Sequence, residues 1–170
     1  VIGLGVGEAH IKSYQRLDNV EVNSICDFDK KRLFEIKKKY NIPEVTEDYK
    51  NITENKNIDL VSICTYDNFH AEQIISCLQN GKHVMVEKPA VLHAYEAESV
   101  IKELENSKLF MTSNLILRKS PRFIKLKEMI DAEAFGEIFH IEGDYFHYIL
   151  EKITDGWRGK MNFYCTVYGG

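Results

Sequence analysis

The sequence predicts an α/β protein with a doubly wound parallel sheet, followed by the truncated start of a second α/β domain with a mainly antiparallel sheet. Up to residue 113, short apolar runs alternate with segments of helical periodicity. The runs are rich in Val and Ile and lack regular polar alternation, which is typical of strands buried on both faces. The pattern changes after Asn114. We therefore expect one domain at residues 1–113 and an incomplete second domain at residues 114–170.

Five apolar runs are expected to form the strands of the first domain. They lie at residues 1–4, 20–26, 60–65, 83–86 and 109–112. Because helical segments separate them, we expect parallel pairing through right-handed crossovers. The first run has only two residues before Gly3, fewer than a buried strand usually has. This shortness indicates a fragment of a longer protein.

Three segments between the runs carry apolar residues at the helical spacing i, i+3, i+4, i+7 or part of it. Their apolar positions are Leu33, Ile36 and Tyr40; Ala71, Ile74, Ile75 and Leu78; and Ala97, Val100, Ile101 and Leu104. Gly81 follows the second segment, where a helix C-terminal cap is expected. These segments predict the crossover helices.

The second part of the chain shows two further patterns. Pro121 begins an expected helix whose inward face carries Phe123, Leu126 and Ile130. Residues 138–148 then alternate between apolar and polar side chains. Such alternation predicts a half-exposed strand of an antiparallel sheet.

Composition narrows the class of protein. The formal net charge is −4, which argues against a general nucleic-acid partner, and no apolar run is long enough for a membrane span. The four cysteines are far apart, without disulfide-framework or metal-ligand spacing, so we expect no metal site. They are expected to be small buried hydrophobic residues in a cytoplasmic protein. These cysteines are Cys26, Cys64, Cys77 and Cys165.

A glycine-rich turn lies between the first strand and the next helix. Residues 1–8 read Val-Ile-Gly-Leu-Gly-Val-Gly-Glu. Gly3 and Gly5 permit a tight turn and close approach of the backbone, including that of Leu4 and Val6, to a pyrophosphate. The third glycine, Gly7, stands one residue earlier than in G-x-G-x-x-G. The turn predicts a dinucleotide site.

Asp27 ends the second expected strand, 22 residues beyond Gly5. An acid at this place accepts hydrogen bonds from an adenosine ribose and repels a 2′-phosphate. Phe28 offers no guanidinium for that phosphate, so NAD is favoured over NADP. The alternative role for Asp27 is to cap the helix that begins near Asp29.

The same glycine pattern also describes class I S-adenosylmethionine methyltransferases. Those proteins usually carry an acid two positions before the first glycine, where this chain has Val1. This difference weakens the methyltransferase alternative and leaves it open at this stage.

Two longer motifs follow the third and fourth expected strands. Residues 65–70 read Thr-Tyr-Asp-Asn-Phe-His and residues 81–89 read Gly-Lys-His-Val-Met-Val-Glu-Lys-Pro. They resemble the T-P-x-x-x-H and G-K-H-V-x-x-E-K-P motifs of the Gfo/Idh/MocA oxidoreductases, the family of glucose–fructose oxidoreductase and inositol 2-dehydrogenase. Shorter matches lie at residues 63–65, 118–121, 123, 135–138 and 157–158. The resemblance favours an oxidoreductase, because a methyltransferase leaves the E-K-P motif unexplained.

The resemblance implies a catalytic role for Lys88, which would contact the substrate hydroxyl and the nicotinamide ribose. Lys88 follows a parallel strand, at the edge where open α/β sheets bind ligands. The resemblance also implies a cis bond before Pro89, which would direct Lys88 into the cleft. The alternative is a solvated lysine beside a loop proline.

The cofactor-binding residues that the resemblance adds are Thr65, Tyr66, His70, Glu87, Lys88 and Arg158. Tyr66 replaces the usual proline of the motif. His70 is either a cofactor neighbour or only a residue of the first turn of a helix, and Trp157 beside Arg158 is equally suited to packing. The remaining histidines singled out, His10, His93, His140 and His147, show no ligand spacing and are expected at the surface or in packing.

The implied function is hydride transfer between NAD(P) and a secondary alcohol or ketone of a sugar, inositol or sugar derivative. The family's downstream Asp and His, which complete the catalytic set, are absent from these 170 residues. A non-catalytic dinucleotide-binding sensor or subunit is therefore the alternative. The resemblance also implies a homo-oligomer, and neither a nucleic acid nor a membrane is expected as a partner.

Overall fold

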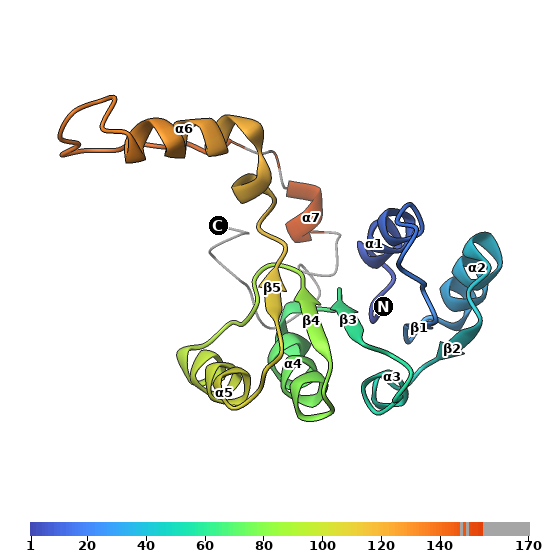
Figure 1. Ribbon diagram of the computed structural model, residues 1–170. Helices are drawn as coiled ribbons and strands as arrows, with labels where there is room; N and C mark the ends of the chain where they lie inside the picture. The colour runs from blue at the N-terminus through green and yellow to red at the C-terminus, as the bar shows by residue number, and fades with distance from the viewer. Residues whose placement is uncertain (147, 149, 155–170) are drawn as a thin grey trace. The chain divides into compact units, whose positions relative to one another are not determined.

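The computed structural model describes residues 1–146, 148 and 150–154. The chain divides into two compact units, Val1–Asn114 and Leu115–Gly170, and the first holds all five strands of the described residues (Figure 1). The assignment of the second unit to the start of a substrate domain stays a prediction.

The first unit is built on parallel strands. They are β1 (Ser24–Cys26), β2 (Glu44–Thr46), β3 (Leu60–Ile63), β4 (His83–Val86) and β5 (Met111–Ser113). β1 pairs with β2, and β4 pairs with both β3 and β5, all in parallel. Ile2 bridges to Cys26 on one side and to Ile63 on the other. The resulting order, β2-β1-Ile2-β3-β4-β5, is that of a doubly wound Rossmann fold, as predicted.

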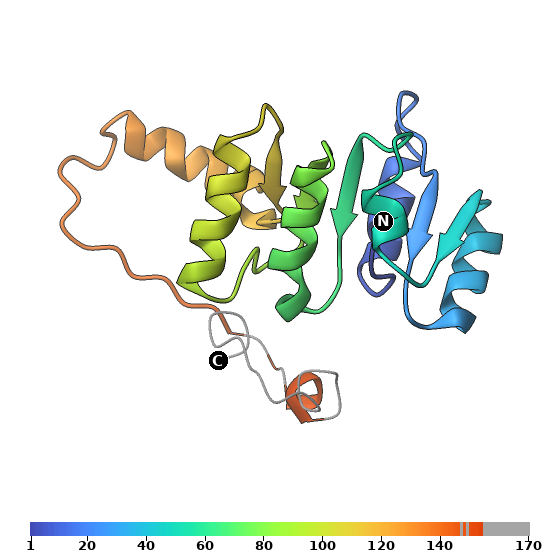
Figure 2. The same ribbon diagram turned by 90° about the horizontal axis from the view of Figure 1, so that it is seen from below.

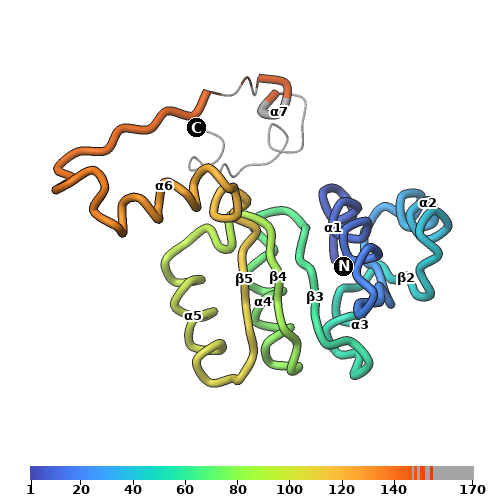
Figure 3. The backbone as a smooth tube through the Cα atoms, turned by 45° about the horizontal axis from the view of Figure 1, so that its top comes forward, coloured from blue at the N-terminus to red at the C-terminus, as the bar shows by residue number. Residues whose placement is uncertain are grey.

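Helices cover both faces of this sheet. They are α1 (Gly7–Tyr14), α2 (Lys30–Tyr40), α3 (Lys50–Thr53), α4 (His70–Gln79) and α5 (Ala94–Glu105), with a short 3₁₀ helix η1 (Asp67–Phe69) before α4. α4 packs against α5, β3 and β4, whereas α1 packs against α2 and β3, and Figures 2 and 3 show α4 and α5 side by side. Two apolar clusters result, one around Ile74 and Val84 and the other around Leu4 and Ile25.

The predicted elements of the first unit are largely confirmed. The strand at residues 83–86 has its predicted bounds, whereas the runs at 20–26 and 60–65 form shorter strands and the fifth strand begins at Met111 rather than at residue 109. The expected strand at residues 1–4 is reduced to the bridges of Ile2. Gly81 ends the α4 segment with φ of +75°, a conformation that glycine adopts without strain. β2 was not predicted, because three residues with exposed and half-buried side chains give no periodic signal.

The second unit contains η2 (Ile116–Lys119), α6 (Pro121–Asp131) and α7 (Leu150–Thr154). The helix at Pro121 is confirmed. Its expected inward face is not, because Phe123 and Leu126 are exposed and only Ile130 is partly buried. Among the described elements of this unit, η2 packs most closely against α6.

The predicted strand at residues 138–148 is wrong for its described residues. Residues 138–146 belong to no helix or strand, and Phe139 is 98% exposed. A strand needs a partner for its backbone hydrogen bonds, and the described residues of this unit provide none. Residue 147 and Trp157 lie outside the described residues.

Cys26, Cys64 and Cys77 are buried and free. Burial raises the pKa of each thiol to about 12, so they are inert packing groups, as predicted. Cys165 lies outside the described residues. None of the described helices is long and apolar enough to cross a membrane.

Two leucine-sized side chains on β3 test this packing. Ile63 is fully buried, whereas Leu60 at the other end of the strand is 43% exposed. We predict that Ile63→Ala lowers the free energy of unfolding of the chain by about 3 kcal/mol and that Leu60→Ala lowers it by less than about 1 kcal/mol. Denaturant titration followed by circular dichroism measures both, and equal losses would contradict the described core.

Candidate functional site

The glycine-rich turn is constrained at two of its three glycines. Gly3 has φ of +84°, and a Cβ there would lie 2.4 Å from the backbone oxygen of Cys64. A Cβ on Gly7 would lie 2.9 Å from a methyl carbon of Val1. These two positions therefore require glycine for the fold itself.

Gly5 is different, because a Cβ there would meet nothing within 4 Å. Gly5 and Val6 are exposed, and no side chain caps the N-terminus of α1. The absent side chain thus leaves open space at the backbone of Gly5, beside the uncapped first turn of α1. A pyrophosphate suits this place, since helix N-termini stabilise anions.

Asp27 links the end of β1 to this turn. Its Oδ2 accepts a hydrogen bond from the backbone N–H of Leu4 at 2.7 Å, and its Oδ1 accepts one from Asp29 at 2.9 Å. The cap of α2 is Asp29, which accepts from the N–H of Arg32. The alternative role of Asp27 as this cap is therefore wrong, while its ribose role stays a prediction.

Arg32 is a neighbour of the glycine-rich turn that no sequence motif predicted. Its Nε donates to the backbone oxygen of Leu4 at 2.7 Å, and its Nη2 lies 3.3 Å from Glu8. Glu8, which stands where the third motif glycine is expected, also accepts from Lys39 at 2.8 Å. The hydrogen bond from Lys39 lowers the pKa of Glu8. The sequence feature that could have indicated Arg32 was its position in the first turn of the helix that follows Asp27.

The loop after β3 brings Thr65, Tyr66 and His70 to the same sheet edge. Thr65 donates from Oγ1 to Gln73 at 2.7 Å, and the ring of Tyr66 lies 6.0 Å from the exposed ring of Phe28. His70 is fully buried at the first position of α4. Its role as a cofactor neighbour stays a prediction.

The imidazole of His70 lies near two backbone oxygens. Nδ1 lies 2.7 Å from the backbone oxygen of Pro89, and Nε2 lies 3.2 Å from that of Thr65. The Lys88–Pro89 peptide bond is cis, as the resemblance implies. Both oxygens only accept hydrogen bonds, so a neutral imidazole donates to one of them at a time. His70 begins α4 directly after the loop that follows β3, and it lies against the loop after β4.

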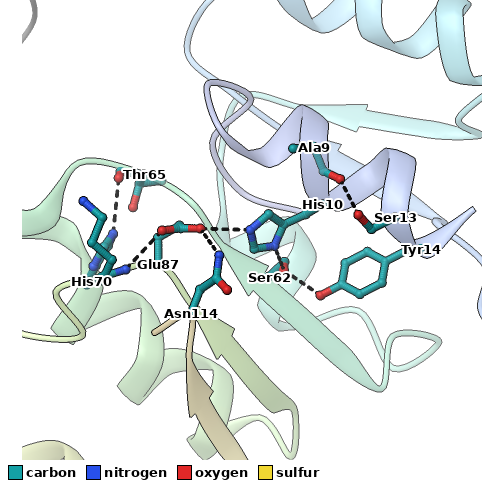
Figure 4. Close-up of polar contacts among 10 residues, drawn as sticks. Ala9, His10, Ser13, Tyr14, Ser62, Thr65, His70, Glu87 and Asn114 are labelled. Carbon is teal, nitrogen blue, oxygen red and sulfur yellow. Dashed lines mark hydrogen bonds and ion pairs between the residues drawn. The ribbon is translucent and has the colours of Figure 1, made fainter. Parts of the chain in front are cut away.

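Glu87 of the E-K-P motif is held by several hydrogen bonds (Figure 4). It is only 8% exposed. Its Oε1 accepts from Nε2 of His10 at 3.0 Å and from Nδ2 of Asn114 at 2.6 Å, and its Oε2 accepts from the backbone N–H of Lys88 at 3.2 Å. The carboxylate thus joins α1, the end of β4 and the end of β5.

The charge of Glu87 is stabilised by these donors. Burial by itself would raise the pKa of the carboxyl, but the hydrogen bonds from His10, Asn114 and Lys88 outweigh it and lower the pKa from 4.5 to about 2. A buried acid remains ionised when hydrogen bonds to its charged form replace the lost water. Glu87 is therefore an anion at neutral pH.

His10 is not a surface residue and does more than pack. It is buried, with Nδ1 2.9 Å from Oγ of Ser62, and the hydroxyl of Tyr14 lies 2.9 Å from the same oxygen. Figure 4 shows this row of side chains running from Tyr14 to Glu87. Helical spacing could have predicted the burial of His10, because it lies on the same face of α1 as the buried residues Gly7 and Ile11.

Most of the predicted site residues meet at one edge. Each follows the carboxyl end of a parallel strand, where open α/β sheets bind ligands. They are Gly3, Leu4, Gly5, Val6, Gly7, Asp27, Thr65, Tyr66, His70, Glu87 and Lys88. Arg158 lies outside the described residues.

This strand order, with a glycine-rich turn and an acid after the next strand, defines the dinucleotide-binding Rossmann class. The family model described as "Oxidoreductase family, NAD-binding Rossmann fold" matches residues 1–115. The chain belongs to this family, the Gfo/Idh/MocA oxidoreductases. The resemblance found in the sequence is thereby confirmed.

The chain is similar to curated proteins that are much longer. Myo-inositol 2-dehydrogenase of Thermotoga maritima is 30% identical over 138 residues, covering 81% of this chain and 41% of that protein. Glycosyl hydrolase family 109 protein 1 of Bacteroides fragilis is 30% identical over 181 aligned positions, covering 98% of this chain and 37% of that protein. This chain thus spans about two fifths of the length of these relatives.

Solved structures show the same fold. The scyllo-inositol dehydrogenase of Lactobacillus casei, with bound NAD(H) and scyllo-inositol, matches with a TM-score of 0.76 at 26% identity. The match covers 81% of this chain and 41% of that one.

The ionised Glu87 gives a pH dependence. A group whose pKa is lower in the folded chain contributes stability above its unfolded pKa, and loses it as the pH falls to the folded value. With pKa values of 4.5 and about 2, Glu87 contributes about 3 kcal/mol at neutral pH. We predict that the wild-type advantage over Glu87→Gln shrinks by about 2 kcal/mol between pH ~7 and ~3. Urea titrations across this range measure it, and a pH-independent difference would contradict the assigned charge.

Proposed function

We propose that this chain binds NAD along the carboxyl edge of its sheet and forms the cofactor-binding part of a dehydrogenase acting on secondary alcohols of polyols or sugars. The observation that supports this most directly is the open space at Gly5 beside the uncapped start of α1. Gly3 and Gly7 are glycines for packing reasons, whereas the described residues give Gly5 no such reason. A ligand that approaches the backbone explains it.

The residues present fit a dinucleotide. The turn at Gly5 and the amides of α1 would hold the pyrophosphate. The Asp27 carboxylate oxygens each accept one backbone hydrogen bond, and each retains a lone pair for a ribose hydroxyl. Its negative charge disfavours a 2′-phosphate, which supports NAD over NADP.

Lys88 is the proposed catalytic residue. Its backbone is fixed by Glu87 on one side and by the bond between Pro89 and His70 on the other. The nicotinamide ring, when bound, supplies the hydride acceptor or donor. The ammonium of Lys88 would contact the substrate hydroxyl and stabilise negative charge that develops on its oxygen.

The relatives support a polyol or sugar substrate. Two of them are named for inositol, and one was solved with scyllo-inositol and NAD(H) bound. We extend this class of substrate to the protein that contains this chain, together with a homo-oligomeric state. The free buried cysteines Cys26, Cys64 and Cys77 support the cytoplasm as its compartment, and the net charge of −4 argues against a nucleic-acid partner.

Gly5→Ala separates cofactor binding from folding. Because the added methyl group meets nothing within 4 Å, we predict unchanged thermal unfolding but at least about tenfold weaker NAD binding, equivalent to about 1.4 kcal/mol. Isothermal titration calorimetry of the wild-type chain with NAD, NADP and S-adenosylmethionine, repeated for the variant, measures both preference and loss. Gly143→Ala, at another glycine with open surroundings, is the matched control and retains wild-type affinity.

The titrations also decide the alternatives. A folded wild-type chain that binds none of the three ligands would refute the proposed function. Binding of S-adenosylmethionine alone would favour the methyltransferase alternative, and equal affinity for NADP would refute the preference assigned to Asp27.

A further inference from the structure

Two buried histidines hold the segment that carries Lys88, one on each side. His10 from α1 contacts Glu87, the residue before Lys88, and His70 from α4 contacts Pro89, the residue after it. His70 is fully buried and His10 is 8% exposed. Both histidines belong to helices that pack on the sheet. Their positions are therefore set by the helices and not by the loop that carries Lys88. The segment is thereby fixed from both faces of the sheet.

We propose that His10 is a positioning residue: by donating from Nε2 to the Glu87 carboxylate, it sets the backbone of Lys88 for the cofactor and substrate. This inference rests on the proposed function, in which Lys88 lies next to both. The chain of contacts is short, because Oε1 of Glu87 meets His10 while Oε2 of the same carboxylate accepts the N–H of Lys88. Rotation of this carboxylate would therefore disturb the Lys88 amide directly.

The partners determine where the His10 hydrogen lies. The Glu87 carboxylate is ionised and only accepts hydrogen bonds, so Nε2 of His10 must carry the hydrogen of their 3.0 Å contact. When the ring is neutral, Nδ1 is bare and accepts from the hydroxyl of Ser62 at 2.9 Å. Ser62 then accepts from the hydroxyl of Tyr14. The row of side chains is thus ordered in one direction toward Glu87.

This order distinguishes positioning from packing. A residue needed only for volume could be replaced by any side chain of similar size. Instead, all four groups from Tyr14 to Glu87 are satisfied by one another at 2.9–3.0 Å, and a buried carboxylate that loses a donor is strongly disfavoured. The arrangement therefore requires a donor at the position of Nε2.

Two substitutions separate the two ends of the imidazole. The amide nitrogen of His10→Gln reaches the position of Nε2 and can still donate to Glu87, whereas the amide of His10→Asn reaches only the position of Nδ1. We expect His10→Gln to bind NAD within about threefold of wild type, and His10→Asn to bind at least about tenfold more weakly, since a bond to a charged group is lost. Calorimetry measures both affinities, and thermal unfolding confirms that each variant is folded.

The matched control is His83→Asn, the same substitution at the amino end of β4, whereas Glu87 and Lys88 follow the carboxyl end of that strand. His83 accepts from the backbone N–H of Phe110 and lies at the amino end of the strand, away from the site. It should retain wild-type NAD affinity. Where His10→Asn does not fold, Asn114→Ala removes the other donor to Oε1 of Glu87 and should weaken NAD binding similarly.

An NMR measurement without cofactor tests the role of His10 separately from NAD binding. The ¹⁵N resonances of the His10 imidazole should show a protonated Nε2 in the free wild-type chain. A bare Nε2, or equal NAD affinity for His10→Gln and His10→Asn, would overturn the positioning role while the proposed function stands. Failure of the wild-type chain to bind NAD would refute the proposed function, and the imidazole signal would still decide the contact with Glu87.

Discussion

The ionised carboxylate of Glu87 is the interaction on which the candidate site depends. A buried charge is costly unless several donors replace its water, and here His10, Asn114 and the backbone of Lys88 do so. These donors come from α1, from the end of β5 and from Glu87's own neighbour. A single anion thus fixes the relative positions of three segments at the carboxyl edge, and a fourth, the loop after β3, leads into His70, which lies against the loop after β4.

The other half of the edge is organised by backbone geometry. Gly3 lies so close to Cys64 that no side chain fits, and Asp27 holds the turn through the N–H of Leu4. Gly5 is then presented with open space in front of it. The two halves meet on adjacent parallel elements, because Ile2 bridges both β1 and β3. A dinucleotide site requires both features, a tightly packed turn at Gly3 and an accessible backbone at Gly5.

Local patterns made the fold and much of the site predictable from the sequence. Apolar periodicity identified α2, α4 and α5, and the E-K-P motif and glycine turn identified the family. Contacts between distant segments gave no such signal. His10 and Glu87 are 77 residues apart, and no spacing rule connects a helix histidine with an acid so far along the chain.

The errors have a related cause. Residues 138–148 have the alternation of a strand, but alternation cannot supply a pairing partner, and residues 138–146 form no strand. The short β2 was missed for the opposite reason, since it is defined by pairing with β1 rather than by its own pattern. Asp27 and Asp29 could not be distinguished as helix caps until their acceptor contacts were known.

The most direct test of a dinucleotide site at this edge is an NMR titration of the ¹⁵N-labelled chain with NAD. We predict that chemical-shift changes concentrate on the amides of Gly5, Val6 and Gly7 and extend to Asp27 and Lys88. Changes confined to the cavity at the amino ends of β1 and β3, which Val22, Ser24 and Leu60 line, would place the ligand at the opposite edge of the sheet. That result would contradict the central claim.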